Sequence, residues 1–195
     1  MKVKICGITS LADASMCERL GADALGFVHF PGRTRSLPLE RIADICSALG
    51  PLTTKVLVCA PSGRSEAMRM LDTSHADILQ LHSLDPESLA DIRRQGVGVI
   101  RAVPPIRSEA SRFATASDAL LFEDGTPGTG RQYDYSQIPI DLCPRAIIAG
   151  GLNLGNLERA KAMNPYALDV SSGVESSPGK KDPALVAEFI RRVKS

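Results

Sequence analysis

The chain contains no tryptophan, and aromatic residues make up only 4% of its 195 residues. A core of this composition is built mainly from aliphatic side chains, which suits parallel strands covered by helices. The sequence also has no C-x-x-C pair, and its five cysteines are widely spaced. These absences argue against a disulfide framework and a zinc site, so we expect no metal.

Long apolar runs are also absent. No stretch reaches the length of a membrane span, and the N-terminal segment turns polar by Thr9, too early for a secretory signal. We therefore expect a cytoplasmic protein with no membrane partner. An excess of charge of either sign is also absent, because 23 Lys and Arg residues balance 22 Asp and Glu residues and no basic run exceeds a pair. This balance argues against nucleic acid and favours a small ligand.

Short apolar runs alternate with segments of helical periodicity from one end of the chain to the other. Ser10 or Thr9 is expected to cap the first helix, and Asp182 before Pro183 the last. The alternation predicts a single (β/α)8 TIM barrel domain over residues 1–195, with a doubly wound sheet as the alternative. The expected strands are 3–6, 24–30, 55–59, 78–81, 98–103, 119–123, 146–149 and 167–170. The expected helices are 11–20, 39–49, 65–73, 86–95, 107–116, 154–162 and 183–193, with only a brief one after Asp134.

Residues capable of chemistry stand at the ends of several predicted strands. Cys6 ends the first strand, Glu123 and Asp124 end the sixth before the glycine-rich segment 125–130, and Asp169 ends the eighth. An isolated cysteine in an apolar run is most often a packing residue. In a barrel, however, the carboxyl ends of all strands meet at one face, where active sites lie. The sequence therefore predicts that these side chains share one site.

Two further strand ends have the composition of a phosphate site. Gly150 and Gly151 follow the seventh strand just before a helix, and Ser171, Ser172 and Gly173 follow the eighth. Glycine lets backbone amides approach an anion, and serine hydroxyls add donors. Barrels often bind phosphate with the loops after these two strands. A glycine pair before a helix is often only a turn, but the joint position at strands seven and eight favours phosphate binding.

Five segments of the sequence are distinctive. They are Lys4-Ile5-Cys6-Gly7-Ile8-Thr9, Gln80-Leu81-His82, Ala149-Gly150-Gly151-Leu152, Asp169-Val170-Ser171-Ser172-Gly173-Val174-Glu175 and Pro178-Gly179-Lys180-Lys181-Asp182. Together they resemble the phosphoribosylanthranilate isomerase family. The resemblance implies a TIM barrel enzyme of tryptophan biosynthesis. Its reaction is the Amadori rearrangement of N-(5-phosphoribosyl)anthranilate to 1-(2-carboxyphenylamino)-1-deoxyribulose 5-phosphate, without metal or organic cofactor. The implied partner is a small phosphosugar, and the expected state is a monomer or homodimer.

The resemblance also implies roles for individual residues. Cys6 matches the general base, and an alignment without a gap puts Glu123 where the family has its acidic aspartate. We favour Glu123 as the acid and keep Asp124, one place later, as the alternative. Arg35 matches the arginine that binds the anthranilate carboxylate, for which a guanidinium fork is well suited, whereas Arg33 is expected to face solvent. The remaining expected substrate contacts are His82 and Asp169.

Two other functions remain open at this point. One is a related phosphosugar barrel, either the histidine-pathway aminoaldose isomerase or a dual-substrate relative. Such barrels resemble two half-barrels with a phosphate motif each, and this chain shows one motif. The other is a non-catalytic phosphosugar-binding barrel that has lost its acid, an alternative that the glutamate at position 123 keeps open.

Overall fold

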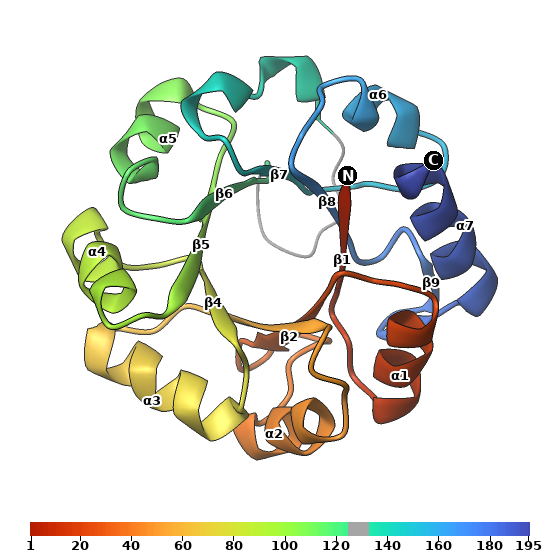
Figure 1. Cartoon of the computed structure of the whole chain (residues 1–195), viewed down its shortest axis with the longest axis horizontal. Coiled ribbons are helices and arrows are strands. Elements are labelled where there is room, and N and C mark those ends of the chain that lie inside the picture. Colours follow the sequence, from red (N-terminus) through yellow and green to blue (C-terminus); the bar gives the residue numbers. More distant parts are fainter. Residues whose placement is uncertain (125–132) are drawn as a thin grey trace.

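Eight parallel strands close into a barrel in the computed structural model, which describes residues 1–124 and 133–195 (Figure 1). Closure is direct, since β1 pairs with both β2 and β8. The predicted TIM barrel is therefore confirmed, and the doubly wound sheet is wrong. The strands are β1 (Lys2–Cys6), β2 (Ala24–His29), β3 (Thr54–Cys59), β4 (Ile78–Leu81), β5 (Gly98–Val103), β6 (Ala119–Phe122), β7 (Ala146–Ile148) and β8 (Ala167–Val170).

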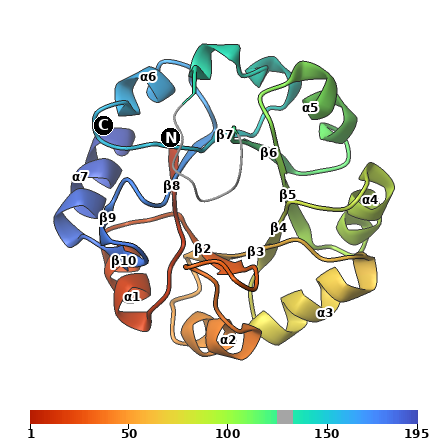
Figure 2. The same cartoon turned by 180° about the vertical axis from the view of Figure 1, so that it is seen from behind.

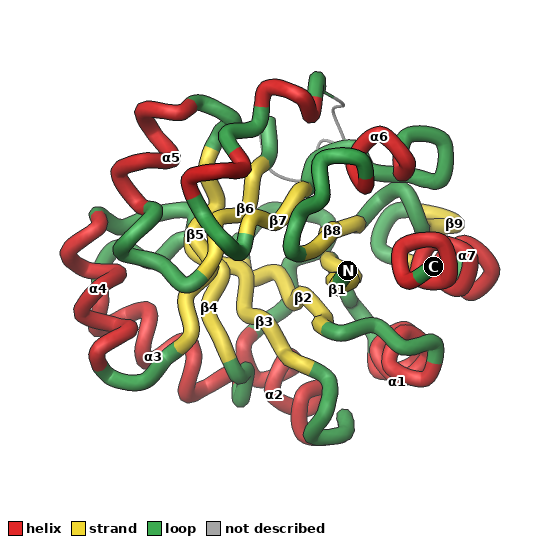
Figure 3. The backbone as a smooth tube through the Cα atoms, turned by 45° about the horizontal axis from the view of Figure 1, so that its top comes forward, coloured by secondary structure: helices red, strands yellow, loops and turns green. Residues whose placement is uncertain are grey.

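Helices form a ring outside the strands (Figure 3). Ser10 is the residue that caps the first helix, because its side chain accepts a hydrogen bond from the Asp13 amide. Asp182 caps the last helix through the amides of Ala184 and Leu185, as the sequence predicts. The helices are α1 (Leu11–Arg19), α2 (Leu39–Ser47), α3 (Arg64–Ser74), α4 (Pro86–Arg94), α5 (Arg107–Phe113), α6 (Leu157–Lys161) and α7 (Pro183–Lys194).

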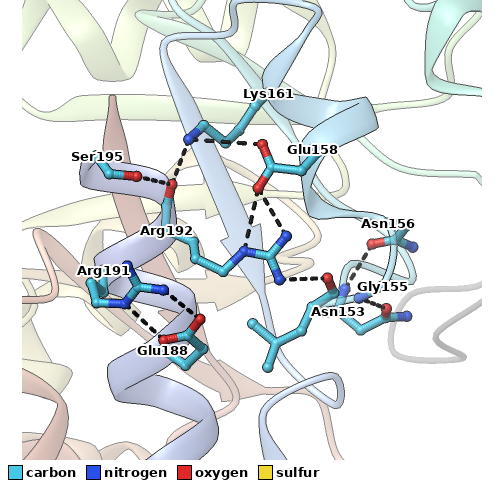
Figure 4. A network of polar contacts seen from close by, with 10 residues as sticks. Asn153, Gly155, Asn156, Glu158, Lys161, Glu188, Arg191, Arg192 and Ser195 are labelled. Atoms are coloured by element: carbon cyan, nitrogen blue, oxygen red, sulfur yellow. Dashed lines mark hydrogen bonds and ion pairs between the residues drawn. The ribbon is translucent and has the colours of Figure 1, made fainter.

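The chain differs from the predicted pattern mainly after β6. A short 3-10 helix, Tyr135–Gln137, follows Asp134 as predicted, and a second one, Ile140–Leu142, also precedes β7. Helix α6 begins three residues later than predicted, because side chains of the preceding segment bind its backbone (Figure 4). Asn156 Oδ1 accepts from the Asn153 amide at 2.9 Å, and Asn153 Oδ1 accepts from the Gly155 amide at 2.8 Å. Such local bonds compete with helical ones.

A hairpin that the sequence pattern does not predict follows β8. Its strands are β9 (Glu175–Ser177) and β10 (Lys180–Lys181), and Gly179 adopts a φ of +82° in the turn. Figure 2 shows the hairpin beside α1 and α7. The hydroxyl of Thr9 donates to the Gly179 carbonyl at 2.6 Å, which fastens the turn to the segment after β1.

The interior of the barrel is lined by alternate strand residues that are mostly small or β-branched, while larger apolar side chains pack between strands and helices. Lys4, Gln80 and Asp169 share this inward register and are almost completely buried. None of the helices in residues 1–124 and 133–195 has the length and apolar character that crossing a membrane requires.

Candidate active site

A cavity of about 740 Å³ opens at the carboxyl ends of the strands. It gathers nine of the residues that the sequence singles out, namely Cys6, Arg35, His82, Glu123, Gly150, Gly151, Asp169, Ser171 and Ser172. Asp124 and Gly173, although both are described by the structure, are not among the residues that line it. The glycine-rich segment that follows Asp124 lies outside the described residues.

Cys6 lies at the end of β1 beside a buried ion pair. Lys4 and Asp169 are directly opposite each other on β1 and β8, and Lys4 Nζ lies 2.9 Å from Asp169 Oδ1. Gly26 on β2 makes room for both β1 side chains. A Cβ at this glycine would lie 2.8 Å from the Cys6 sulfur and 2.9 Å from Lys4 Nζ. The thiol and the ammonium therefore both lie against Gly26, and the ammonium is paired with Asp169.

Burial raises the pKa of the Cys6 thiol above its ordinary value, and the negative charge of Asp169 raises it further. The cations Lys4 and Lys181 oppose this shift by stabilising the thiolate. Burial alone would lower the pKa of Lys4, but Asp169 and Cys6 reverse the effect and raise it. Lys4 is therefore a permanent cation beside a thiol that rests in its protonated form.

Glu123 follows β6 and faces His82, which follows β4. Glu123 Oε1 lies 3.3 Å from His82 Nδ1, and both side chains are largely buried. Burial, followed by the charge of Asp169, raises the pKa of Glu123 to about 7. Burial, with Arg101 and Lys4, lowers the pKa of His82 to about 4. A neutral imidazole has one donor and one acceptor nitrogen, so this contact is compatible with either protonation state of Glu123.

The loops after β7 and β8 lie against each other at one side of the cavity. Gly150 and Gly151 have φ values of +83° and +66°, a conformation that L side chains rarely adopt. The Asn156 amide group donates to the Gly151 carbonyl at 2.8 Å and fixes this turn. A Cβ on Gly173 would lie 1.9 Å from the Leu152 carbonyl oxygen. Gly173 therefore acts by letting the two loops approach, whereas Ser171 and Ser172 line the cavity.

Arg35, on the segment between β2 and α2, lines the cavity and is bound to the hairpin. Its Nε and Nη2 atoms donate to the two carboxylate oxygens of Glu175 at 2.9 and 2.6 Å. Arg33 is exposed, as predicted, but it also lines the rim of the cavity. Both arginines can therefore reach an anion at this side.

The wall formed by β2, β3, β5 and the residues that follow β2 and β5 is apolar. His82 and Phe30 form a T-shaped pair with ring centroids 5.4 Å apart. An apolar wall in a cavity that also holds Arg35 can accept an aromatic ring that carries a carboxylate. The wall is lined by Val28, Phe30, Val58, Ala102, Val103 and Pro104.

Several residues of the site have roles that the sequence does not reveal. Gly26, Glu175 and Lys181 act through neighbours distant in sequence. Gln80 is 3% exposed and lines the cavity, and within the described part of the chain its Oε1 atom has no hydrogen-bond partner. The sequence signals for Gln80 are its position two residues before His82 in an apolar strand and its place in the segment Gln80-Leu81-His82. Its buried, unpaired oxygen indicates a ligand contact.

These features define the class of the protein as an α/β-barrel enzyme whose site is formed by a thiol, carboxylates and glycine-rich loops at the strand ends. A family model described as N-(5'phosphoribosyl)anthranilate (PRA) isomerase matches residues 3–192. The chain belongs to the phosphoribosylanthranilate isomerase family, whose members are isomerases of tryptophan biosynthesis.

Individual relatives agree with this assignment. The chain is 39% identical over its whole length to N-(5'-phosphoribosyl)anthranilate isomerase from Stutzerimonas stutzeri, covering 98% of that protein. It matches the crystal structure of phosphoribosyl anthranilate isomerase from Thermus thermophilus with a TM-score of 0.89 and 38% identity, covering 100% of this chain and 99% of that one. A phosphoribosyl anthranilate isomerase in complex with reduced 1-(O-carboxyphenylamino)-1-deoxyribulose 5-phosphate also matches, with a TM-score of 0.89, 31% identity and coverage of 100% and 98%.

Proposed function

We propose that the protein isomerises N-(5-phosphoribosyl)anthranilate with Glu123 as the general acid and Cys6 as the general base. The observation that carries the proposal is the pairing of these groups in one cavity, where Glu123 has a pKa of about 7. An acid with this pKa is still half protonated at neutral pH, whereas an ordinary carboxyl group is not. Asp124 is the weaker candidate because it does not line the cavity.

The reaction follows from these roles. Glu123 donates its proton to the furanose ring oxygen, and the C1′–O bond breaks to leave a Schiff base. The Cys6 thiolate then removes the C2′ proton, and the electron pair of that C–H bond moves to give an enolamine. Tautomerisation of the enolamine yields the ketone. Lys4 is the counter-ion that makes a thiolate attainable at this buried position.

The two anionic ends of the substrate fit different groups of the cavity. Amides at Gly150 and Gly151, with Ser171 and Ser172, bind the phosphate in this proposal. Arg35 binds the anthranilate carboxylate, and the apolar wall takes the ring. Asp169 and the unpaired oxygen of Gln80 accept hydrogen bonds from substrate hydroxyls or the amine, and Gly173 supports the phosphate loop.

The fluorescence of freshly made phosphoribosylanthranilate tests the proposal, since turnover consumes it. The wild-type protein should consume the signal, and Cys6→Ala should abolish turnover while leaving the circular dichroism spectrum unchanged. Glu123→Gln should be severely impaired and Asp124→Asn much less so. The reverse order would transfer the acid role to Asp124. A wild-type protein that only shifts the signal without turnover would be a binding protein rather than an enzyme.

The proposal also covers the location and the oligomeric state of the protein. We propose a cytoplasmic protein that takes a small phosphosugar and acts as a monomer or homodimer. One structural relative is described as generated monomers of the dimeric phosphoribosylanthranilate isomerase from Thermotoga maritima. Analytical ultracentrifugation over a concentration series distinguishes the two states.

A further inference from the structure

The hairpin after β8 places one carboxylate between two cations. Glu175 receives Arg35 Nε and Nη2 on its two oxygens, and Lys181 Nζ donates to the Oε1 atom of Glu175 at 2.8 Å. Glu175 and Lys181 are cross-strand partners in the β9–β10 register. The Gly179 amide adds a further bond to Oε2 at 3.2 Å. Glu175 is thus held by β10, by the turn of the hairpin and by Arg35.

The charges of this cluster do not balance. The side chains of Lys181 and Glu175 are 0% and 4% exposed, and that of Arg35 is 16% exposed. Burial would raise the pKa of Glu175, but the hydrogen bonds from Arg35 and Lys181 outweigh it and hold the pKa at about 2. Two cations and one permanent anion leave one net positive charge, and Arg35 is the member of the cluster that lines the cavity. An incoming carboxylate would neutralise the cluster.

Arg35 is also held in one orientation. Glu175 occupies the Nε and Nη2 edge, which leaves Nη1 without a partner among residues 1–124 and 133–195. Gly7 provides the space for the side chain, since a Cβ there would lie 2.6 Å from Arg35 Cδ. The same Cβ would lie 2.8 Å from Ser171 Oγ. The stem of Arg35 therefore packs beside the serine of the proposed phosphate loop.

The hairpin connects the two ends of the site. Lys181 Nζ donates to the Ser171 carbonyl at 3.2 Å as well as to Glu175. The Lys181 amide donates to Asp13 Oδ2 at 3.1 Å, which anchors the hairpin on α1 (Figure 2). Ser171 and Arg35 consequently belong to one connected unit with a fixed separation.

We propose that Glu175 is a positioning residue that orients Arg35, and that the hairpin sets the distance between the phosphate and the carboxylate that the site accepts. This inference rests on the proposed function. It makes the hairpin a specificity device, because an analogue without the carboxylate gains nothing from an oriented Arg35.

Binding of two probes tests the inference. One is reduced 1-(O-carboxyphenylamino)-1-deoxyribulose 5-phosphate, and the other is the same compound with a phenyl ring that lacks the carboxylate. Glu175→Gln alone leaves Lys181 buried without its partner and can fail to fold, so the decisive protein is Glu175→Gln combined with Lys181→Met. Because Lys181 also donates to the Ser171 carbonyl, its reference is Lys181→Met alone, which keeps the Arg35–Glu175 pair. Relative to that reference, we expect the double variant to bind the carboxylated probe on the order of 10- to 100-fold more weakly, the size of a charged hydrogen bond, and the other probe equally well. KM for the substrate should rise more than kcat falls.

Glu188→Gln is the matched control, because Glu188 on α7 makes a bidentate pair with Arg191 at 2.8 and 2.6 Å but lies exposed on the outside of the barrel (Figure 4). It should bind both probes as wild type does. Equal losses for both probes in the double variant relative to Lys181→Met, or no loss for either, would overturn the inference while the proposed function stands. A wild-type protein that binds neither probe and turns over no substrate would overturn the proposed function, and this inference with it.

Discussion

Cys6 and Glu123 have pKa values raised by the same cause, which is their burial close to Asp169. Their proposed roles need opposite states, with Cys6 ionised and Glu123 protonated. Because the pKa of Cys6 lies above that of Glu123, only a small fraction of molecules carries this combination at any pH. That fraction is constant between the two pKa values and falls outside them.

The pH dependence of kcat/KM should reflect this arrangement. We expect it to rise about tenfold per pH unit up to about pH 7, to stay level, and to fall only above the raised pKa of Cys6. Stopped-flow or steady-state fluorescence across a buffer series measures the profile. Ultraviolet absorbance of the thiolate, with Cys6→Ala as the blank, locates the Cys6 pKa independently. A profile that already declines between pH 7 and the measured thiol pKa would contradict the assignment.

Gly26 is a second residue whose effect is specific to the site. Gly26→Ala puts a methyl group against the Cys6 sulfur and Lys4 Nζ, so both must move. Displacing the base by ~1 Å costs on the order of 100-fold in kcat, and we expect a loss of that order. Gly63→Ala is the control, since a Cβ there meets nothing within 4 Å. If Gly26→Ala were fully active, the thiol would not need its present position.

Among the secondary-structure elements, the effect of a helix cap on stability can be measured by single substitutions. Asp182 accepts hydrogen bonds from the first free amides of α7, at 2.9 and 3.0 Å. Asp182→Ala should lower the free energy of unfolding by about 1 kcal/mol, as measured by urea denaturation. Asp182→Asn keeps an acceptor and should lose much less. Equal losses for the two variants would indicate that the charge of Asp182, rather than its cap, is what matters.

The secondary-structure elements differ in how well the sequence predicts them. The eight barrel strands are apolar runs, and parallel strands buried on both faces need such runs, so the barrel is visible in the sequence. Strand β9 has three residues and β10 has two, too few to show a period. The candidate site likewise contains residues that the sequence predicts and residues that it does not. Residues at strand ends can be predicted from the barrel geometry, whereas Gly26, Gln80 and Lys181 matter only because the register sets them against particular side chains.

For the whole molecule, the buried pair of Lys4 and Asp169 joins the first strand to the last. Lys4→Met leaves a buried carboxylate without its cation, which should destabilise the fold by about 3–5 kcal/mol. Combining Lys4→Met with Asp169→Leu removes both charges and should recover most of that stability without recovering activity. Urea denaturation and the fluorescence assay measure the two effects.

Lys2→Met tests the specificity of this result. Lys2 is also on β1 and pairs with Asp23 at 2.9 Å, but it is exposed, so its loss should change stability little. Activity in the double variant of Lys4 and Asp169 would mean that the thiol needs no counter-ion.

The order of the strands around the barrel also distributes the chemistry along the chain. A cut in the turn between α4 and β5 would leave Cys6, Arg35 and His82 on one fragment, and Glu123, Gly150 and Asp169 on the other. Neither fragment would then hold both the base and the acid. Catalysis by a mixture of the two fragments would show that they have associated into the barrel. Complementation in solution therefore measures barrel assembly directly.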